Sequence, residues 1–496
     1  MSSVPFPLVA SPAPGDAADV AGTAGAQTPG LAPLTRAQYH EVVARLAAQN
    51  ADLQALNAEL QVLVAVLQER LKLDSTNSSK PPSSDGPGGG NRAQRRASQR
   101  KRGAQKGHPG AFRAVLPEEQ VHGITECPPP ALCDCGGAVA AQGKPLRHQV
   151  FDLPPVMPEV REYRLYSGVC TGCGKAHRAV LPPGVPSGQI GPRALALVGV
   201  LGTRYHLTQF KIRDLLAHMM GLDFSVGAIS QVHGKVAAAL KAPVAEAAAT
   251  LARAPVLHLD ETRYPRAGSG NWAWAAVQPK LAVYSLLPSR ARYVIHDLIG
   301  QAPQGVVVSD RYAAYAYIDA TQRQVCWAHL LRDFTRIAQR AGLAGRVGRR
   351  WFGLGCVMFR WREQGMTSAE PFEPLQRRLR QALQRGVEQS QCSRTANTCQ
   401  NLLKLWPALW GFITHPRVEP TNNAAEQALR TIVLKRKISG PTRSRRGDEF
   451  IARGYSAFET CRRQGRDFLG YMHSAMIAWI DKTAHPSLLP QLVPTG

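Results

Sequence analysis

The chain alternates between stretches without a regular hydrophobic pattern and stretches with a clear one. Residues 1–34 are rich in Ala, Pro and Gly and lack periodic apolar positions, so we predict that they are disordered. Within 36–74, leucines recur every seven residues, at Leu46, Leu53, Leu60 and Leu67. With these at d positions, Asn50 and Asn57 fall at a, which is typical of a parallel two-stranded coiled coil. The alternative is an amphipathic helix packed on its own chain.

A low-complexity segment follows the heptads. Ser, Pro and Gly dominate LKLDSTNSSKPPSSDGPGGG, which predicts a flexible linker over 75–120. Between Asn91 and Phe112 the linker carries no acidic residue and seven basic ones, Arg92, Arg95, Arg96, Arg100, Lys101, Arg102 and Lys106. A basic run is usually a solvated tail, but in an unstructured segment it is also suited to wrap phosphates.

Two helical patterns lie within 191–254. LTQFKIRDLLAHMM predicts an amphipathic helix that ends at Gly221, and Ser225 is placed to cap a second helix, SVGAISQVHGKVAAAL. Two helices around a short turn resemble a DNA-binding helix-turn-helix. Two ordinary packed helices explain the pattern equally well.

From Pro255 the pattern changes to short apolar strands. VLHLD, NWAWAAV and LAVYSLL predict three strands, ARYVIHDLIG a helix, and VVVSD and QVC two further strands. This order predicts a mixed α/β sheet in a core over 255–460. Residues 330–415 are largely helical and basic, helix returns after Pro420, and 461–496 form a helical tail.

Charge changes this picture from a generic globular protein to one with a polyanionic partner. The chain has 60 Lys+Arg against 35 Asp+Glu, a net charge of +25, and nucleic acid is the commonest partner of such a protein. No charged segment precedes an apolar run at the N-terminus, and no stretch is apolar enough to span a bilayer. We therefore expect a cytoplasmic, nucleoid-associated protein.

Half of the ten cysteines are clustered within 121–187, which we expect to form a zinc module. Cys170-x-x-Cys173 is a knuckle that aims two thiolates at one ion, and Cys133-x-Cys135 is a partner pair for a tetrahedral Zn²⁺ site. Cys127 and His177 are rival ligands.

Two apolar strands each end in an aspartate, Asp260 after VLHL and Asp310 after VVVS. Carboxylates at the ends of neighbouring strands can share Mg²⁺ or Mn²⁺ ions, which prefer hard oxygen ligands. Glu426, in the first turn of a later helix, is the third candidate. Its alternative is structural, because Asn423-x-x-Glu426 resembles a capping box. Glu261 is a rival ligand, although strand alternation should turn it to the opposite side.

Several motifs in order resemble one family. HLDETRY, VVSDRYAAY, CWAHLLRDF and PTNNAAEQALR, preceded by the heptads, NSSKPPSSD and the cysteine cluster, are similar to the insertion-sequence transposases of the "sixty-six" family. The resemblance implies an RNase H-like core with a helical insertion before the last acid. It places Asp260, Asp310 and Glu426 on the family's catalytic triad. Cys326-x-x-His329 also matches, whereas Cys133-x-Cys135 departs from the family's CxxC.

These observations predict a metal-dependent transposase that binds terminal inverted repeats and target DNA as a homodimer or higher oligomer, with or without accessory proteins. A second basic patch beside the acids, with Arg430, Lys435, Arg436 and Lys437, is expected to contact phosphates. The alternatives are a non-catalytic DNA-binding protein, a decayed transposase, or a nuclease that cuts without joining.

Overall fold

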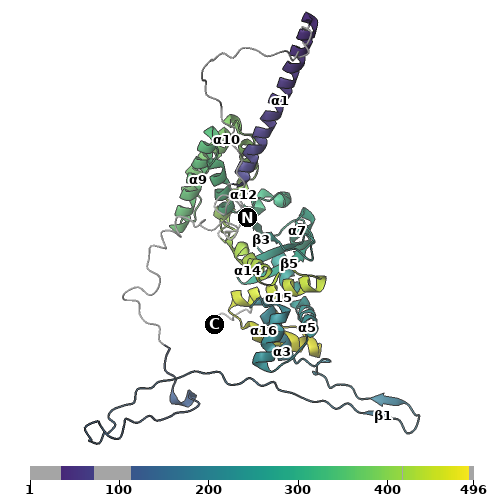
Figure 1. The fold of residues 1–496 in the computed structure, drawn as a ribbon, viewed down its shortest axis with the longest axis vertical. Helices are drawn as coiled ribbons and strands as arrows, with labels where there is room; N and C mark the ends of the chain where they lie inside the picture. The colour runs from purple at the N-terminus through teal and green to yellow at the C-terminus, as the bar shows by residue number, and fades with distance from the viewer. Residues whose placement is uncertain (1–34, 72–112, 416, 491–496) are drawn as a thin grey trace, which may run out of the picture. The chain divides into compact units, whose positions relative to one another are not determined.

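The computed structural model describes residues 35–71, 113–415 and 417–490 (Figure 1). These residues fall into two units, one within Met1–Lys72 and the other within Leu73–Gly496. In the first unit the predicted heptads form one long helix, α1, Arg36–Leu71. Leu46, Leu53 and Leu60 of α1 are 56%, 64% and 51% exposed, so the single chain does not bury this stripe. The helix is confirmed, and its dimerisation stays a prediction. The segment 1–34, expected to be disordered, lies outside the described residues.

The centre of the second unit is a five-stranded mixed sheet with the strand order β5-β4-β3-β6-β7. Its strands are β3 Val256–Arg263, β4 Trp272–Gln278, β5 Leu281–Leu287, β6 Val306–Ser309 and β7 Arg323–Val325. β3, β4 and β5 pair antiparallel, whereas β6 pairs parallel with both β3 and β7. Helix α7, Arg292–Ile299, connects β5 to β6. The predicted mixed α/β sheet is therefore confirmed.

Side-chain alternation along β6 divides the interior into two cores. Val307 packs into a core shared with the helices before the sheet and at the end of the chain. Val306 and Val308, on the other face, pack into a core built from the helices that follow β7. Because successive side chains of a strand point to opposite faces, both faces of the sheet are covered.

The first core is formed by the predicted helical region and the C-terminal helices. These are α3 Pro192–Thr203, α4 Gln209–Met220, α5 Val226–Ala239, α6 Lys241–Ala252, α14 Asn423–Ser439, α15 Arg445–Gln464 and α16 Phe468–Asp481. α4 ends at Gly221, which has a left-handed φ of 63°, and Ser225 caps α5 through its side chain, both as expected. α15 lies against β5 (Figure 1).

Part of the outer edge of β5 is paired by side chains of α15. The Thr460 hydroxyl of α15 bonds to both the N–H and the C=O of Ala282, and Ser456 accepts from the N–H of Tyr284. Side chains of α15 thus replace a sixth strand, which protects the edge from pairing with another chain.

A helical stretch separates β7 from α14, as expected for 330–415. It comprises α8 Trp327–Ala338, α9 Gly342–Glu363, α10 Glu373–Gln389, α11 Ser393–Lys404 and two short helices, α12 Trp406–Leu409 and α13 Gly411–Thr414. Large buried side chains, among them Trp351, Leu383 and Phe412, form a core of their own with β6 and β7. No helix among the described residues is long and apolar enough to cross a membrane.

Short elements complete the account of the described residues. Four are 3-10 turns, η2 Glu118–Gln120, η3 Ala313–Tyr317, η4 Ala320–Gln322 and η5 Glu370–Phe372. A separate hairpin, β1 Ser167–Val169 and β2 Ala176–Arg178, lies in the cysteine-containing segment.

Candidate active site

The parallel pairing of β3 with β6 brings two aspartates level with each other. Val256, Leu257 and His258 pair with Val306, Val307 and Val308, an offset of 50 residues. The same offset relates Asp260 to Asp310, one residue past the end of β6. Neighbouring strands lie about 4.8 Å apart, so the two carboxylates start from adjacent backbone positions.

Asp260 does not end its strand, contrary to expectation. β3 continues to Arg263 because Asp260, Glu261, Thr262 and Arg263 go on pairing with the antiparallel β4. Only the pairing with β6 stops before Asp260. The aspartate therefore lies at a fork, where one neighbouring strand has ended and the other supports it.

The acids of this fork are close enough to perturb one another. Burial, followed by the negative charges of Glu261 and Asp310, raises the pKa of Asp260 well above its ordinary value, and Glu426 adds to the effect. The N–H of Glu261 donates to Asp260 Oδ1 at 2.9 Å, and this hydrogen bond lowers the pKa of Asp260 and so offsets part of the increase. A divalent cation would relieve this repulsion, and carboxylate oxygens are the ligands that Mg²⁺ and Mn²⁺ prefer, so these side chains fit such an ion.

Glu261 has a separate set of partners. Its carboxylate pairs with Arg290 at 2.9 Å and accepts from the Tyr315 hydroxyl at 3.0 Å, and its side chain is 3% exposed. Burial and the charge of Asp310 raise the pKa of Glu261 to about 7, although Arg290 opposes the shift. Glu261 is therefore held by its own ion pair beside the fork, a role that the sequence pattern did not indicate.

Glu426 lies in the first turns of α14, which is tied to β3 by Asn422. The Asn422 amide donates to the Leu259 carbonyl at 3.0 Å, and its oxygen lies 3.1 Å from His258 Nδ1. Asn422 precedes the helix but makes no side-chain cap, and the helix begins at Asn423. Because a capping box needs its acid three residues after the N-cap, the capping box with Asn423 is not formed.

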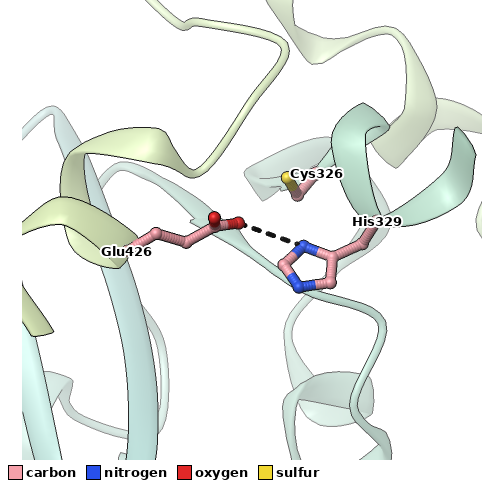
Figure 2. A group of neighbouring side chains, drawn as sticks. All are labelled: Cys326, His329 and Glu426. Carbon is pink, nitrogen blue, oxygen red and sulfur yellow. Dashed lines mark ion pairs between the residues drawn. The ribbon is translucent and has the colours of Figure 1, made fainter. Parts of the chain in front are cut away.

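Two residues of α8 face the Glu426 carboxylate. His329 Nδ1 lies 3.4 Å from Oε1 (Figure 2). An Arg332 guanidinium nitrogen lies 3.7 Å from Oε2. Both His329 Nδ1 and Glu426 Oε1 are buried without a hydrogen-bond partner. Cys326, His329 and Glu426 form the only group of three metal-ligating side chains in the described chain whose ligand atoms lie within 4.8 Å of one another. Asp260, Asp310 and Glu426 do not meet that distance as a trio.

Comparison with known proteins identifies the family of this chain. Residues 187–449, more than half of the chain, match the model of the Transposase IS66 family. The chain belongs to the Transposase IS66 family. Residues 31–114 of this transposase-family chain match a family of unknown function, DUF6444. Proteins similar to this chain include the uncharacterized protein y4hP of Sinorhizobium fredii (strain NBRC 101917 / NGR234). The two sequences are 25% identical over 391 residues, which cover 67% of this chain and 68% of the relative. No solved structure matches this chain.

The basic patch of this IS66-family chain divides into exposed and buried members. Arg430 and Lys437 of α14 are exposed, and an Arg436 guanidinium donates to the Arg263 carbonyl. Lys435 is only 7% exposed and donates to the Leu207 carbonyl at 3.1 Å. Burial lowers the pKa of Lys435 to about 8. Contrary to expectation, its ammonium group therefore points into the protein, away from solvent and from any DNA on the surface.

The basic arm of the linker cannot be placed in the same way. Its members lie outside the described residues, namely Arg95, Arg96, Arg100, Lys101, Arg102 and Lys106. Their contact with DNA stays a prediction.

The cysteine segment forms two separate turns. The Cys133 N–H donates to the Gly137 carbonyl at 2.9 Å, and the Cys170 N–H to the Lys175 carbonyl at 2.9 Å. The pKa of Cys133 is lowered chiefly by a hydrogen bond from the Cys135 N–H, and the pKa of Cys170 by one from Cys173. Among the described residues these thiols form no three-ligand group within 4.8 Å, so the four-cysteine zinc site stays a prediction.

Proposed function

We propose that this chain cuts the ends of a mobile element's DNA and joins them to target DNA, using Asp260, Asp310 and Glu426 as its metal-binding acids in an RNase H-like core. The observation that carries this proposal is that Asp310 follows the end of β6 at the same 50-residue offset that pairs β6 with β3, level with Asp260, and that the charges of Asp310 and Glu426 both act on Asp260. The strand order β5-β4-β3-β6-β7, with a helical insertion before the helix that carries Glu426, supports the fold assignment.

Each residue of the site has a distinct part in this chemistry. Asp260 and Asp310 would hold Mg²⁺ or Mn²⁺ from the sheet, and Glu426 would complete the ligand set from α14. Bound ions supply activation of the attacking oxygen and stabilisation of the leaving oxygen in an in-line phosphoryl transfer. His329 and Arg332 position Glu426, because they contact its two carboxylate oxygens.

The remaining parts of the chain would bring DNA to this site. Arg430 and Lys437 extend from the helix that carries Glu426 and are exposed to solvent. Phosphate contacts of this kind orient a duplex without reading its sequence. The linker arm and a zinc module at Cys133, Cys135, Cys170 and Cys173 would add affinity, and α1 would join two chains through its exposed leucines.

The experiment is a cleavage assay on labelled linear DNA that carries the element's end, with Mg²⁺ and the purified full chain. Asp310→Asn should lower cleavage at least about a hundredfold, because it removes a direct metal ligand. Asp297→Asn, the same change at an exposed position of α7, is the matched control and should cleave normally. DNA binding in EDTA should stay within about twofold for both variants, since phosphate affinity comes from Lys and Arg.

Product analysis separates the alternatives. Cleaved ends covalently joined to a second DNA identify a transposase, whereas cut ends that never join identify a nuclease. Metal-independent binding without any cleavage identifies a non-catalytic DNA-binding protein. Full cleavage by Asp310→Asn would refute the assignment of the acids.

A further inference from the structure

A group of three potential metal ligands of mixed chemistry lies where two helices begin. Cys326 immediately precedes α8, His329 lies in the first turn of α8, and Glu426 lies in the first turns of α14. The starts of the two helices are joined directly, because the Trp327 N–H donates to the Pro420 carbonyl at 2.9 Å and the Asn422 N–H to Cys326 Sγ at 3.2 Å. The three side chains are thus held together by the fold.

We infer that Cys326, His329 and Glu426 bind a thiophilic divalent cation, for which Zn²⁺ is the best fit. The sulfur and imidazole ligands exclude Mg²⁺ as the preferred ion, because Mg²⁺ binds oxygen almost exclusively. One thiolate, one imidazole and one carboxylate are all common zinc ligands, and three protein ligands leave the fourth position open. The inference holds whether or not the chain cuts DNA, but it gives Glu426 Oε1 to this cation and so leaves only Oε2, which Arg332 contacts, for the ions of the proposed function.

The distances suit a tetrahedral ion. Two ligands bound at about 2.0–2.1 Å at a tetrahedral angle lie roughly 3.3 Å apart, and a nitrogen and a sulfur roughly 3.6 Å apart. His329 Nδ1 and Glu426 Oε1 lie 3.4 Å apart, and all three ligand atoms lie within 4.8 Å (Figure 2). Because the sulfur of Cys326 lies at most 4.8 Å from the other two ligand atoms, each of its separations needs to shorten by no more than roughly 1.2 Å to complete the set.

Two atoms of the group lack the partners that buried polar atoms normally have. Glu426 Oε1 and His329 Nδ1 are buried and form no hydrogen bond, and they face each other. Unsatisfied buried polar atoms are rare in folded proteins and often indicate a missing water or ion. The nearest opposing charge is Arg332, which is 30% exposed and contacts the other oxygen, Oε2, so it leaves Oε1 available for a metal.

The test uses Co²⁺ as a spectroscopic substitute for Zn²⁺ in the full chain. The five exposed cysteines at 127, 133, 135, 170 and 173 are first replaced by Ser to remove the zinc site predicted there. Co²⁺ bound through a thiolate has a near-ultraviolet charge-transfer band that oxygen and nitrogen ligands alone do not produce. We expect this band with one Co²⁺ per chain, displaced by Zn²⁺.

Single changes in this background assign the ligands. Cys326→Ser should abolish the band, and Cys356→Ser, at an exposed cysteine of α9, should leave it unchanged. His329→Gln should weaken Co²⁺ binding by at least the roughly 10–100-fold that is typical of outer-shell changes, because His329 supplies a direct ligand. Circular dichroism checks folding, and the His329→Gln result decides if Cys326→Ser does not fold. Absence of a thiolate band in the folded background chain, or a band that survives Cys326→Ser, would overturn the inference.

Discussion

The burial of Lys435 leads to a prediction that separates a structural from a DNA-binding role. The residue is 7% exposed, and its ammonium group donates to the Leu207 carbonyl, which links α14 to the segment before α4. Burial lowers its pKa from 10.5 to about 8. At about 1.4 kcal/mol per unit, the shift implies that the charged form is destabilised by about 3 kcal/mol on folding.

Lys435→Met should therefore stabilise the chain near neutral pH. The variant removes the cost of burying the charge and keeps a side chain of similar length. It leaves the Leu207 carbonyl without this donor, at a cost of about 1–2 kcal/mol. The free energy of unfolding at pH 7 should thus rise by about 1–2 kcal/mol.

The stability difference between the wild type and Lys435→Met depends on pH. Below pH 8 the lysine is charged in both the folded and unfolded states, so the wild-type penalty is fully present. Between pH 8 and 10.5 the folded state releases the proton while the unfolded state keeps it, so wild-type stability rises relative to the variant. The advantage of Lys435→Met should therefore shrink as pH rises from 8 and reverse between about pH 9 and 10, where the remaining penalty falls below the cost of the lost donor.

Urea unfolding followed by tryptophan fluorescence, at pH 7 and at pH 10, measures these differences. The DNA affinity of Lys435→Met is measured in parallel and compared with that of Arg430→Met, which changes an exposed position of the same helix. Arg430→Met should weaken DNA binding severalfold and Lys435→Met should not, since only Arg430 is accessible to phosphates. A Lys435→Met variant that is less stable at pH 7 and binds DNA as weakly as Arg430→Met would refute the reasoning.

The remaining predictions concern the other parts of the chain. Metal analysis of the reduced protein should detect about one zinc per chain less in Cys170→Ser than in the wild type, because the site inferred at Cys326 keeps its own ion, and an unchanged zinc content would exclude the knuckle as a ligand pair. A wild-type peptide of residues 36–75 should sediment as a dimer, and replacing both Leu53 and Leu60 with Pro should abolish this self-association. A monomeric wild-type peptide would contradict the coiled coil. Gly386→Val should destabilise the helical insertion by about 1–3 kcal/mol in thermal unfolding, because its Cβ would lie 2.5 Å from the buried Cys399 Sγ, and unchanged melting would refute this close packing.

The sequence by itself determined the elements and their order. Leucines repeated every seven residues indicate α1, and short apolar runs indicate the strands of the sheet. Gly221 and Ser225 mark the end of α4 and the start of α5. These are local properties, because helix and strand periods and the cap residues act within a few neighbouring positions. The ordered motifs also led to the family that the comparison shows.

Only the tertiary structure decided which of the chemical groups meet. The 50-residue offset between β3 and β6 places Asp260 level with Asp310, and no local pattern contains a pairing register. The approach of α8 to α14 brings His329 and Arg332 to Glu426, and the packing of α14 buries Lys435 while leaving Arg430 exposed. Charge and burial at each group depend on neighbours that are distant in the chain, so the pKa of Asp260 and the accessibility of each lysine are properties of the folded structure alone.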